Sequence, residues 1–177
     1  PAQVDLPEHR TRDLGNRPWW HRAAVENKPE GDAAEVAVRS NYSRIEPQTD
    51  NQLREIIANT YGQIAFIDEQ VGRIMTLLKD SGLGENTIVI YTSDHGDWLG
   101  DHGHILKGPM PYEGLLRVPF LAKGPGVRSG AVVAEPVSTL DIAATLYDYS
   151  GVAPGLEQHG QSLRPQLEGD APRAFAM

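Results

Sequence analysis

A long hydrophobic period of about 3.6 residues limits the fold of this 177-residue chain more than any other feature. Apolar residues recur at the spacing of one helix face, at Leu53, Ile56, Ile57, Ile64, Ile67, Val71, Ile74, Met75 and Leu78. Thr49 with Gln52 is typical of a capping-box start, and Lys79 with Gly82 is typical of a helix end. The pattern predicts a helix over residues 50–81 that is roughly 45 Å long. Such a helix spans a domain larger than this chain alone needs.

Two short apolar runs after this helix predict strands. Residues 87–91 are mainly β-branched and aromatic, which predicts a strand buried on both faces. Residues 118–122 predict a second strand, and the proline within it restricts this strand to a sheet edge or a strand start. Residues 138–151 predict another helix, in which Ser138 and Asp141 form the cap. Alternating helices and strands favour an α/β fold, a three-layer α/β/α sandwich with a mostly parallel sheet.

Composition excludes several classes of protein. With 40% hydrophobic and 23% charged residues, the chain has the make-up of a soluble globular protein with its own core. The absence of cysteine excludes disulfides, thiolate metal ligands and a cysteine nucleophile within these residues. A net charge of −8 argues against a nucleic-acid partner. No apolar run reaches the roughly 18 residues of a membrane span, so we expect a soluble protein, cytoplasmic or periplasmic/secreted.

The chain divides near residue 48. Residues 1–48 contain five prolines and no sustained period, which predicts an irregular, loop-rich segment with a short helix around 19–25. Residues 49–177 contain all the other predicted elements. The polar, proline-containing opening is typical of the inside of a longer protein, so we expect a fragment.

The sequence Asp94-His95-Gly96 directly after the first predicted strand is the strongest candidate for a functional site. In open α/β sheets, ligands bind beyond the carboxyl ends of the strands. A carboxylate at the edge of the interior needs a cation or hydrogen-bond donors. The imidazole of His95 adds a second donor, and Gly96 allows a sharp turn, which together suit a divalent metal ion. The alternative is a turn or helix-capping aspartate beside a surface histidine.

Lys107 follows in a glycine-rich loop that we expect to return to the same end of the sheet. Together with Asp94 and His95, its ammonium would supply positive charge for an anionic tetrahedral substrate held by a metal. The alternative is a solvated loop lysine. His102 and His104, in a second Asp-His-Gly stretch, are as easily solvated as functional.

Residues 86–126, NTIVIYTSDHGDWLGDHGHILKGPMPYEGLLRVPFLAKGPG, resemble the carboxyl-side signature of the sulfatases of the alkaline-phosphatase-like superfamily. The shared features are a strand, Ser-Asp-His/Asn-Gly, a glycine-rich loop, a lysine, Tyr-Glu, Arg-Val-Pro and Pro-Gly. With similar flanking segments, the resemblance covers about residues 55–170. It implies an alkaline-phosphatase-like fold, with residues 49–177 as the carboxyl-side part of the catalytic domain.

The resemblance also implies roles for individual residues. Asp94 and His95 would be ligands of the catalytic divalent cation, and Lys107 would bind the sulfate oxygens. Calcium is the first expectation, with manganese or zinc as alternatives because an imidazole nitrogen suits them better. Family members use a formylglycine nucleophile from a Cys/Ser-x-Pro-x-Arg motif, which residues 1–48 lack.

We therefore expect a sulfatase that acts on a small-molecule or saccharide sulfate ester, with the formylglycine outside this chain. The 177 residues alone are predicted to be inactive and to need the remainder of the catalytic domain as a partner; an oligomer stays open. One alternative is a phosphonate monoester hydrolase or phosphodiesterase of the same superfamily. Another is a non-catalytic binding module with the same fold and no bound metal.

Overall fold

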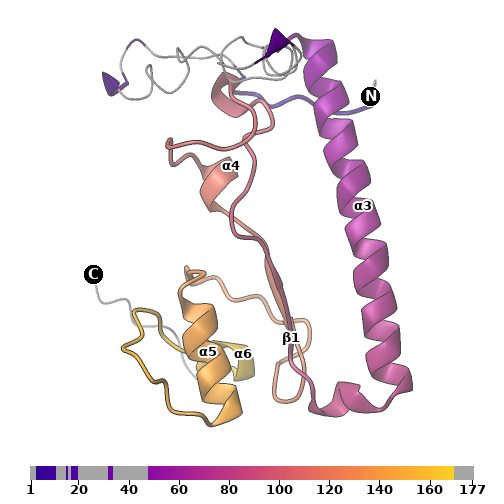
Figure 1. Cartoon of the computed structure of the whole chain (residues 1–177), viewed down its shortest axis with the longest axis vertical. Helices are drawn as coiled ribbons and strands as arrows, with labels where there is room; N and C mark the ends of the chain where they lie inside the picture. Colours follow the sequence, from indigo (N-terminus) through magenta and orange to yellow (C-terminus); the bar gives the residue numbers. More distant parts are fainter. Residues whose placement is uncertain (1–2, 11–14, 16, 20–31, 34–47, 170–177) are drawn as a thin grey trace. The chain divides into compact units, whose positions relative to one another are not determined.

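Figure 1 shows the computed structural model of the chain, which describes residues 3–10, 15, 17–19, 32–33 and 48–169. The chain forms two compact units. Unit 1 contains Pro1–Arg73 and His95–Val118, and unit 2 contains Ile74–Asp94 and Pro119–Met177. The short helix expected around 19–25 lies almost wholly outside the described residues. The predicted boundary after residue 48 stays a prediction.

The long helix α3, Asp50–Asp80, confirms the prediction from the hydrophobic period (Figure 1). Its capping box is formed as predicted, because Thr49 N donates to Gln52 Oε1 at 3.0 Å and Gln52 N donates to Thr49 Oγ1 at 3.3 Å. At the other end, Gly82 N donates to Lys79 O at 3.1 Å. Gly82 has a φ of 71°, the left-handed conformation that ends helices.

Only the first turns of α3 bury their apolar face. Leu53 and Ile57 are each 3% exposed and form one core cluster of unit 1 together with Ile105. In contrast, Ile64 is 50% exposed and Ile67 is 46% exposed. The described residues of unit 1 therefore cover the beginning of the predicted apolar face and leave its middle in solvent.

Unit 2 contains the two predicted strands, β1 at Val89–Thr92 and β2 at Phe120–Lys123. They pair antiparallel, with Val89 opposite Lys123 and Thr92 opposite Phe120. β2 begins directly after Pro119, as expected for a strand that a proline precedes. β1 is half-buried rather than buried on both faces, because β2 is its only neighbouring strand among the described residues. The one described pairing thus differs from the expected parallel sheet.

Three short 3-10 or α-helical segments and two further helices complete the described elements: η1 at Leu83–Asn86, η2 at Asp101–Gly103, α4 at Glu113–Leu116, α5 at Asp141–Ser150 and α6 at Arg164–Glu168. α5 begins at Asp141 rather than at Ser138, and it ends, as predicted, before a left-handed Gly151 with φ 66°. The predicted cap is formed in one direction only, because the Asp141 amide bonds to the Ser138 carbonyl and not to its hydroxyl. Asp141 is 1% exposed, and its Oδ2 accepts the Ser138 amide at 2.7 Å.

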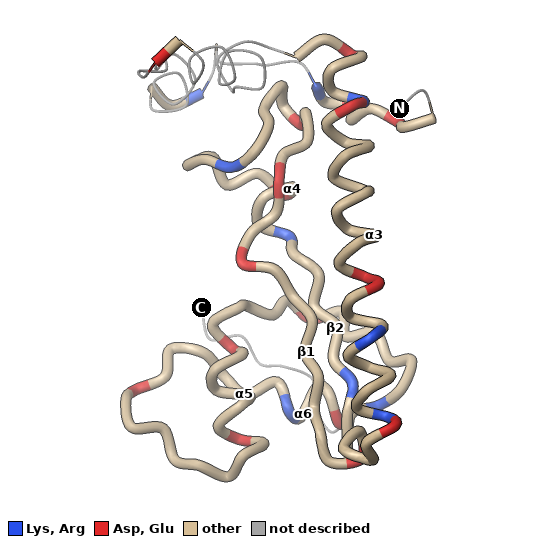
Figure 2. Tube along the Cα trace, turned by 45° about the vertical axis from the view of Figure 1, so that its right-hand side comes forward, with Lys and Arg blue, Asp and Glu red and all other residues tan. Residues whose placement is uncertain are grey.

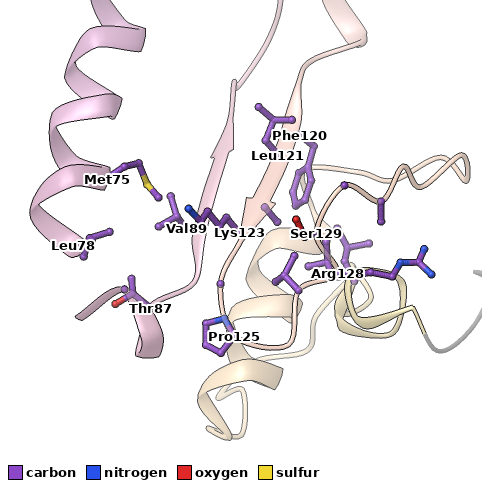
Figure 3. A pocket seen from close by; sticks show the side chains of 18 of the residues that line it. Met75, Leu78, Thr87, Val89, Phe120, Leu121, Lys123, Pro125, Arg128 and Ser129 are labelled. Carbon is purple, nitrogen blue, oxygen red and sulfur yellow. The ribbon is translucent and has the colours of Figure 1, made fainter. Parts of the chain in front are cut away.

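A groove of about 1270 Å³ lies within unit 2 (Figure 3). Its walls come from the end of α3, from both strands and from the segment that follows β2, and they include Met75, Leu78, Val89, Phe120 and Leu121. Leu121 is 64% exposed. The groove is therefore an accessible apolar surface next to the two-stranded sheet.

Charged residues of both signs are interspersed along the described trace (Figure 2). Among the described residues, no helix combines the length and apolar character that crossing a membrane requires.

Candidate active site

The candidate site begins two residues after the end of β1. Asp94 is exposed, whereas the sequence predicted a carboxylate at the edge of a buried strand. The difference follows from β1, which is itself only half-buried. An exposed carboxylate does not bear the desolvation cost of a buried charge, so Asp94 does not need a cation for stability.

His95 follows Asp94 in the chain and is half-buried. Its Nδ1 lies 2.8 Å from the carbonyl oxygen of Gly96. Because a carbonyl oxygen only accepts, Nδ1 carries a proton in this contact, and the lone pair of a neutral ring is then on Nε2. Nε2 lies 2.8 Å from Nζ of Lys107. The structure thus brings together His95 and Lys107, two of the three residues that the sequence singled out.

Gly96 is needed for a close approach of two backbones. Its amide donates to the carbonyl of Leu115 at 2.8 Å, and a Cβ at position 96 would overlap with the carbonyl oxygen of Gly114. α4 therefore lies directly against the turn that holds His95. The sequence predicted a glycine here for a sharp turn, and the observed reason is the contact with α4.

Residues 97–107, which we call the lysine loop, carry the chain from this turn to Lys107. Trp98 N donates to Leu106 O at 3.1 Å, and Gly100 N donates to His104 O at 2.7 Å. These two pairings fold the loop back on itself like a hairpin. The return of Lys107 to His95 follows from this fold, as the sequence predicted for the glycine-rich loop.

Asp97 opens the lysine loop and was not singled out by the sequence. Its Oδ1 accepts the amide of Leu99 at 2.9 Å. Burial raises the pKa of Asp97 above its ordinary value, and hydrogen bonds from the amides of Leu99 and Leu106 oppose that rise.

The histidines of the second Asp-His-Gly stretch differ in exposure, since His104 is buried and the side chain of His102 is 30% exposed. His104 is 1% exposed, and its ring lies 5.1 Å from the buried ring of Trp98. The ring of His102 stacks on Tyr112 with a centroid distance of 4.0 Å. Both histidines therefore pack the lysine loop against aromatic neighbours, which no spacing in the sequence revealed.

Glu113 and Arg117 are four positions apart, a spacing that favours an ion pair on a helix, but the ion pairs of the described residues do not include one between them. α4 ends at Leu116, and Arg117 has an extended backbone with ψ 90°. Its side chain therefore does not stand one helical turn above Glu113, and only its amide bonds back, to Glu113 O at 2.8 Å.

The side chains of Asp94 and His95 are of the types that could supply some of the ligands of a divalent cation. A carboxylate and an imidazole with its proton fixed on Nδ1 by a backbone carbonyl are ordinary ligands of divalent cations. Two such side chains supply two or three bonds at most, and the described part of the chain contains no group of three or more metal-ligating side chains. The further ligands of a bound cation would have to come from elsewhere in the protein.

The sulfatase family model matches residues 28–152. Arylsulfatase K of Danio rerio is 41% identical over 119 residues, which is 67% of this chain and 23% of that relative. An arylsulfatase of Clostridium perfringens is 39% identical over 120 residues, 66% of this chain and 25% of that relative. Among solved structures, a phosphonate monoester hydrolase from Silicibacter pomeroyi matches with a TM-score of 0.79 and 29% identity, covering 99% of this chain and 34% of that one.

The chain therefore spans about a quarter of the length of these two curated relatives. The structural match supports the α/β class of the predicted fold. Because the family model covers well over half of the residues, including the turn at His95 and the lysine loop, this chain belongs to the sulfatase family.

Proposed function

We propose that the full-length protein hydrolyses sulfate monoesters and depends on a divalent metal ion. The observation that carries the proposal is the contact of 2.8 Å between Lys107 Nζ and His95 Nε2, at the turn after β1. Membership of the sulfatase family and relatives named arylsulfatase support it. The substrate class would be a small-molecule or saccharide sulfate ester.

Lys107 would bind the sulfate oxygens. Its side chain is exposed, so the ammonium can turn from the imidazole to an incoming anion. A fixed positive charge next to oxygens that gain negative charge stabilises the transition state of the transfer. The lysine loop presents this charge beside the imidazole of His95.

Asp94 and His95 would be metal ligands, with calcium as the first expectation and manganese or zinc as alternatives. When bound, the cation would act as a Lewis acid on the sulfate oxygens. The task of this chain is to hold the imidazole in one tautomer through the Gly96 carbonyl. The formylglycine nucleophile would come from outside these 177 residues, which contain no cysteine, so the chain alone would be inactive.

The remainder of the catalytic domain would be the partner of this chain. The exposed apolar residues of α3, such as Ile64 and Ile67, and the groove of unit 2 are surfaces that further strands and helices would cover. We propose that such additions complete an α/β/α sandwich in which residues 49–177 form the carboxyl-side part.

Metal analysis and turnover of the full-length protein test the proposal together. We expect hydrolysis of 4-nitrophenyl sulfate and one tightly bound divalent ion per chain. Asp94→Ala and His95→Ala should lower both the metal content and the rate, whereas the exposed Asp80→Ala should change neither. Full metal content and rate in Asp94→Ala would contradict the proposed ligand role.

Phosphonate monoester hydrolysis is the second candidate, favoured by the match to the Silicibacter pomeroyi enzyme. Rates on 4-nitrophenyl phenylphosphonate and 4-nitrophenyl sulfate, measured side by side, separate the two reactions. A protein with no turnover of either ester and no bound metal would instead be a binding module with this fold.

A further inference from the structure

Residues 4–10, which we call the strap, lie against a core cluster of unit 1. Val4 and Leu6 are half-buried and pack against the cluster that contains Ile105. Asp5, between them, is exposed. Such alternation is typical of an extended segment that turns one edge to the core, because successive side chains point to opposite sides. The strap therefore has an apolar edge that covers the cluster.

The same cluster holds the lysine loop. Ile105, on the returning arm of the loop two residues before Lys107, is 3% exposed. Leu99, on the outgoing arm, also packs against the cluster. A Cβ at Gly100 would overlap with the side chain of Leu53, so the loop lies directly on the first turns of α3. The strap, α3 and both arms of the lysine loop thus share one set of apolar contacts.

The strap also binds the middle of the lysine loop through its backbone. The carbonyl oxygen of His9 accepts the amide of His102. The rings of the two histidines lie 17° from parallel, with a centroid distance of 6.3 Å. His102 is left-handed, with a φ of 52°, which residues other than glycine seldom adopt and which persists only where the surroundings hold it. The contacts of His9 are part of what holds it.

Apolar contacts should dominate the attachment of the strap. Arg10 Nε also donates to Asp50 Oδ1 at 3.2 Å, at the first residue of α3. These two side chains are 44% and 53% exposed, and an ion pair so exposed contributes little because water screens it. Burial of Val4 and Leu6 removes apolar surface from water, and leucine is the larger of the two. Truncation of Leu6 should therefore loosen the strap most.

We propose that the strap positions the lysine loop, with Leu6 fixing Ile105 on α3 and His9 fixing His102, and that neither residue touches the substrate. The catalytic consequence rests on the proposed function, which assigns Lys107 to the sulfate oxygens. Without the strap, the returning arm of the loop and its lysine lose their fixed position. None of these contacts uses the imidazole of His95, so a metal ion bound to that ring leaves them in place.

Hydrogen exchange in the full-length protein tests the attachment itself. Leu6→Ala should speed exchange of the His102 amide about 10-fold or more, because a loosened strap exposes that amide to water. The amide of Leu163, which donates to Thr145 Oγ1 at 2.9 Å in unit 2, should keep its wild-type rate. Asp5→Ala is the matched control, since it alters an exposed residue of the same strap, and it should leave both rates unchanged. Unchanged exchange at His102 in Leu6→Ala overturns the proposal, and so does equal acceleration at both amides.

Two further variants separate positioning from a failure to fold. Leu6→Ile keeps the apolar volume and should exchange at close to the wild-type rate. If Leu6→Ala does not fold, Val4→Ala removes less apolar surface and serves for the same comparison of the His102 and Leu163 amides. The same two outcomes would then overturn the proposal.

A double-mutant cycle on kcat/KM tests the catalytic consequence. Leu6→Ala should lower kcat/KM for 4-nitrophenyl sulfate about 10- to 100-fold, as expected for a small misplacement of a catalytic group. In a Lys107→Ala background it should cost nothing more, because the group that the strap positions is already absent. Equal losses in both backgrounds would mean a general structural role and would overturn the proposal. If Lys107→Ala keeps full activity, the proposed function of Lys107 fails, and exchange at the His102 amide still decides whether the strap holds the loop.

Discussion

The ammonium of Lys107 lies 2.8 Å from Nε2 of His95, although 12 residues separate the two in the sequence. The contact joins the two ends of a loop that leaves and re-enters the same site. Since the Gly96 carbonyl fixes the proton of His95 on Nδ1, the ring offers its lone pair in the direction of Lys107. An imidazole and an ammonium are thus oriented before any substrate arrives.

Removal of this ammonium should slow the transfer reaction in the full-length protein. We expect Lys107→Ala to lower kcat/KM for 4-nitrophenyl sulfate by about 100- to 1000-fold, the range for loss of one preorganised oxyanion donor. Lys107→Arg should keep part of the rate, because it keeps the charge but changes its shape. Lys79→Ala, at an exposed lysine near the end of α3, should keep the wild-type rate. Equal rates for Lys107→Ala and wild type would remove Lys107 from the site.

Gly96→Ala should destabilise the protein. The added methyl group overlaps with the Gly114 carbonyl, so α4 must move, at a cost of about 1–3 kcal/mol. Gly72→Ala is the matched control within α3, since no atom lies within 4 Å of a Cβ there. Removing a glycine from a helix interior should stabilise by about 0.5–1 kcal/mol. Urea unfolding of the two variants should therefore shift in opposite directions, and a shift in the same direction would contradict this reading of Gly96.

The sequence predicted well those elements whose signals are local. The start of α3 depends on Thr49 and Gln52, three residues apart, and its end depends on the conformation of Gly82. Both signals act within one helical turn, so neighbouring residues are sufficient to find them. The same holds for the start of β2 after Pro119.

Features that depend on distant contacts were missed. The antiparallel pairing of β1 with β2 joins residues about thirty positions apart, and no local pattern fixes its direction. Burial of His104 and stacking of His102 on Tyr112 depend on a loop in which His102 itself is left-handed, with φ 52°. A sequence shows the histidines but not the backbone conformation that turns them inward. Asp97 was overlooked for the same reason.

Asp141→Ala should destabilise unit 2 strongly. The buried carboxylate accepts the amides of Ser138 and Gln161, the latter at 2.9 Å, and alanine leaves both amides without this acceptor. At about 1–3 kcal/mol for each lost partner, the expected loss is about 2–4 kcal/mol. Hydrogen exchange at the Gln161 amide should become faster.

Asp148→Ala is the control for this loss. Asp148 pairs with Arg164 on the surface, at 39% and 41% exposure, where an ion pair contributes about 0–1 kcal/mol. If Asp141→Ala lowers the free energy of unfolding no more than Asp148→Ala does, the buried carboxylate does not stabilise unit 2 more than a surface ion pair does.

Ionisation of Tyr149 should lower the free energy of unfolding at alkaline pH. Burial raises the pKa of Tyr149 above its ordinary value of 10.0, and the negative charge of Glu168 raises it further. Below about pH 10 the phenol is neutral in both the folded and the unfolded state. As the pH rises from there through the folded pKa, the unfolded state loses the proton first, so the free energy of unfolding falls.

Tyr149→Phe keeps the ring next to Arg164 and removes the ionisation, so urea midpoints measured between about pH 9 and 11 should fall less steeply than in wild type. Glu168→Gln should give an intermediate slope, and parallel slopes for Tyr149→Phe and wild type would contradict the raised pKa.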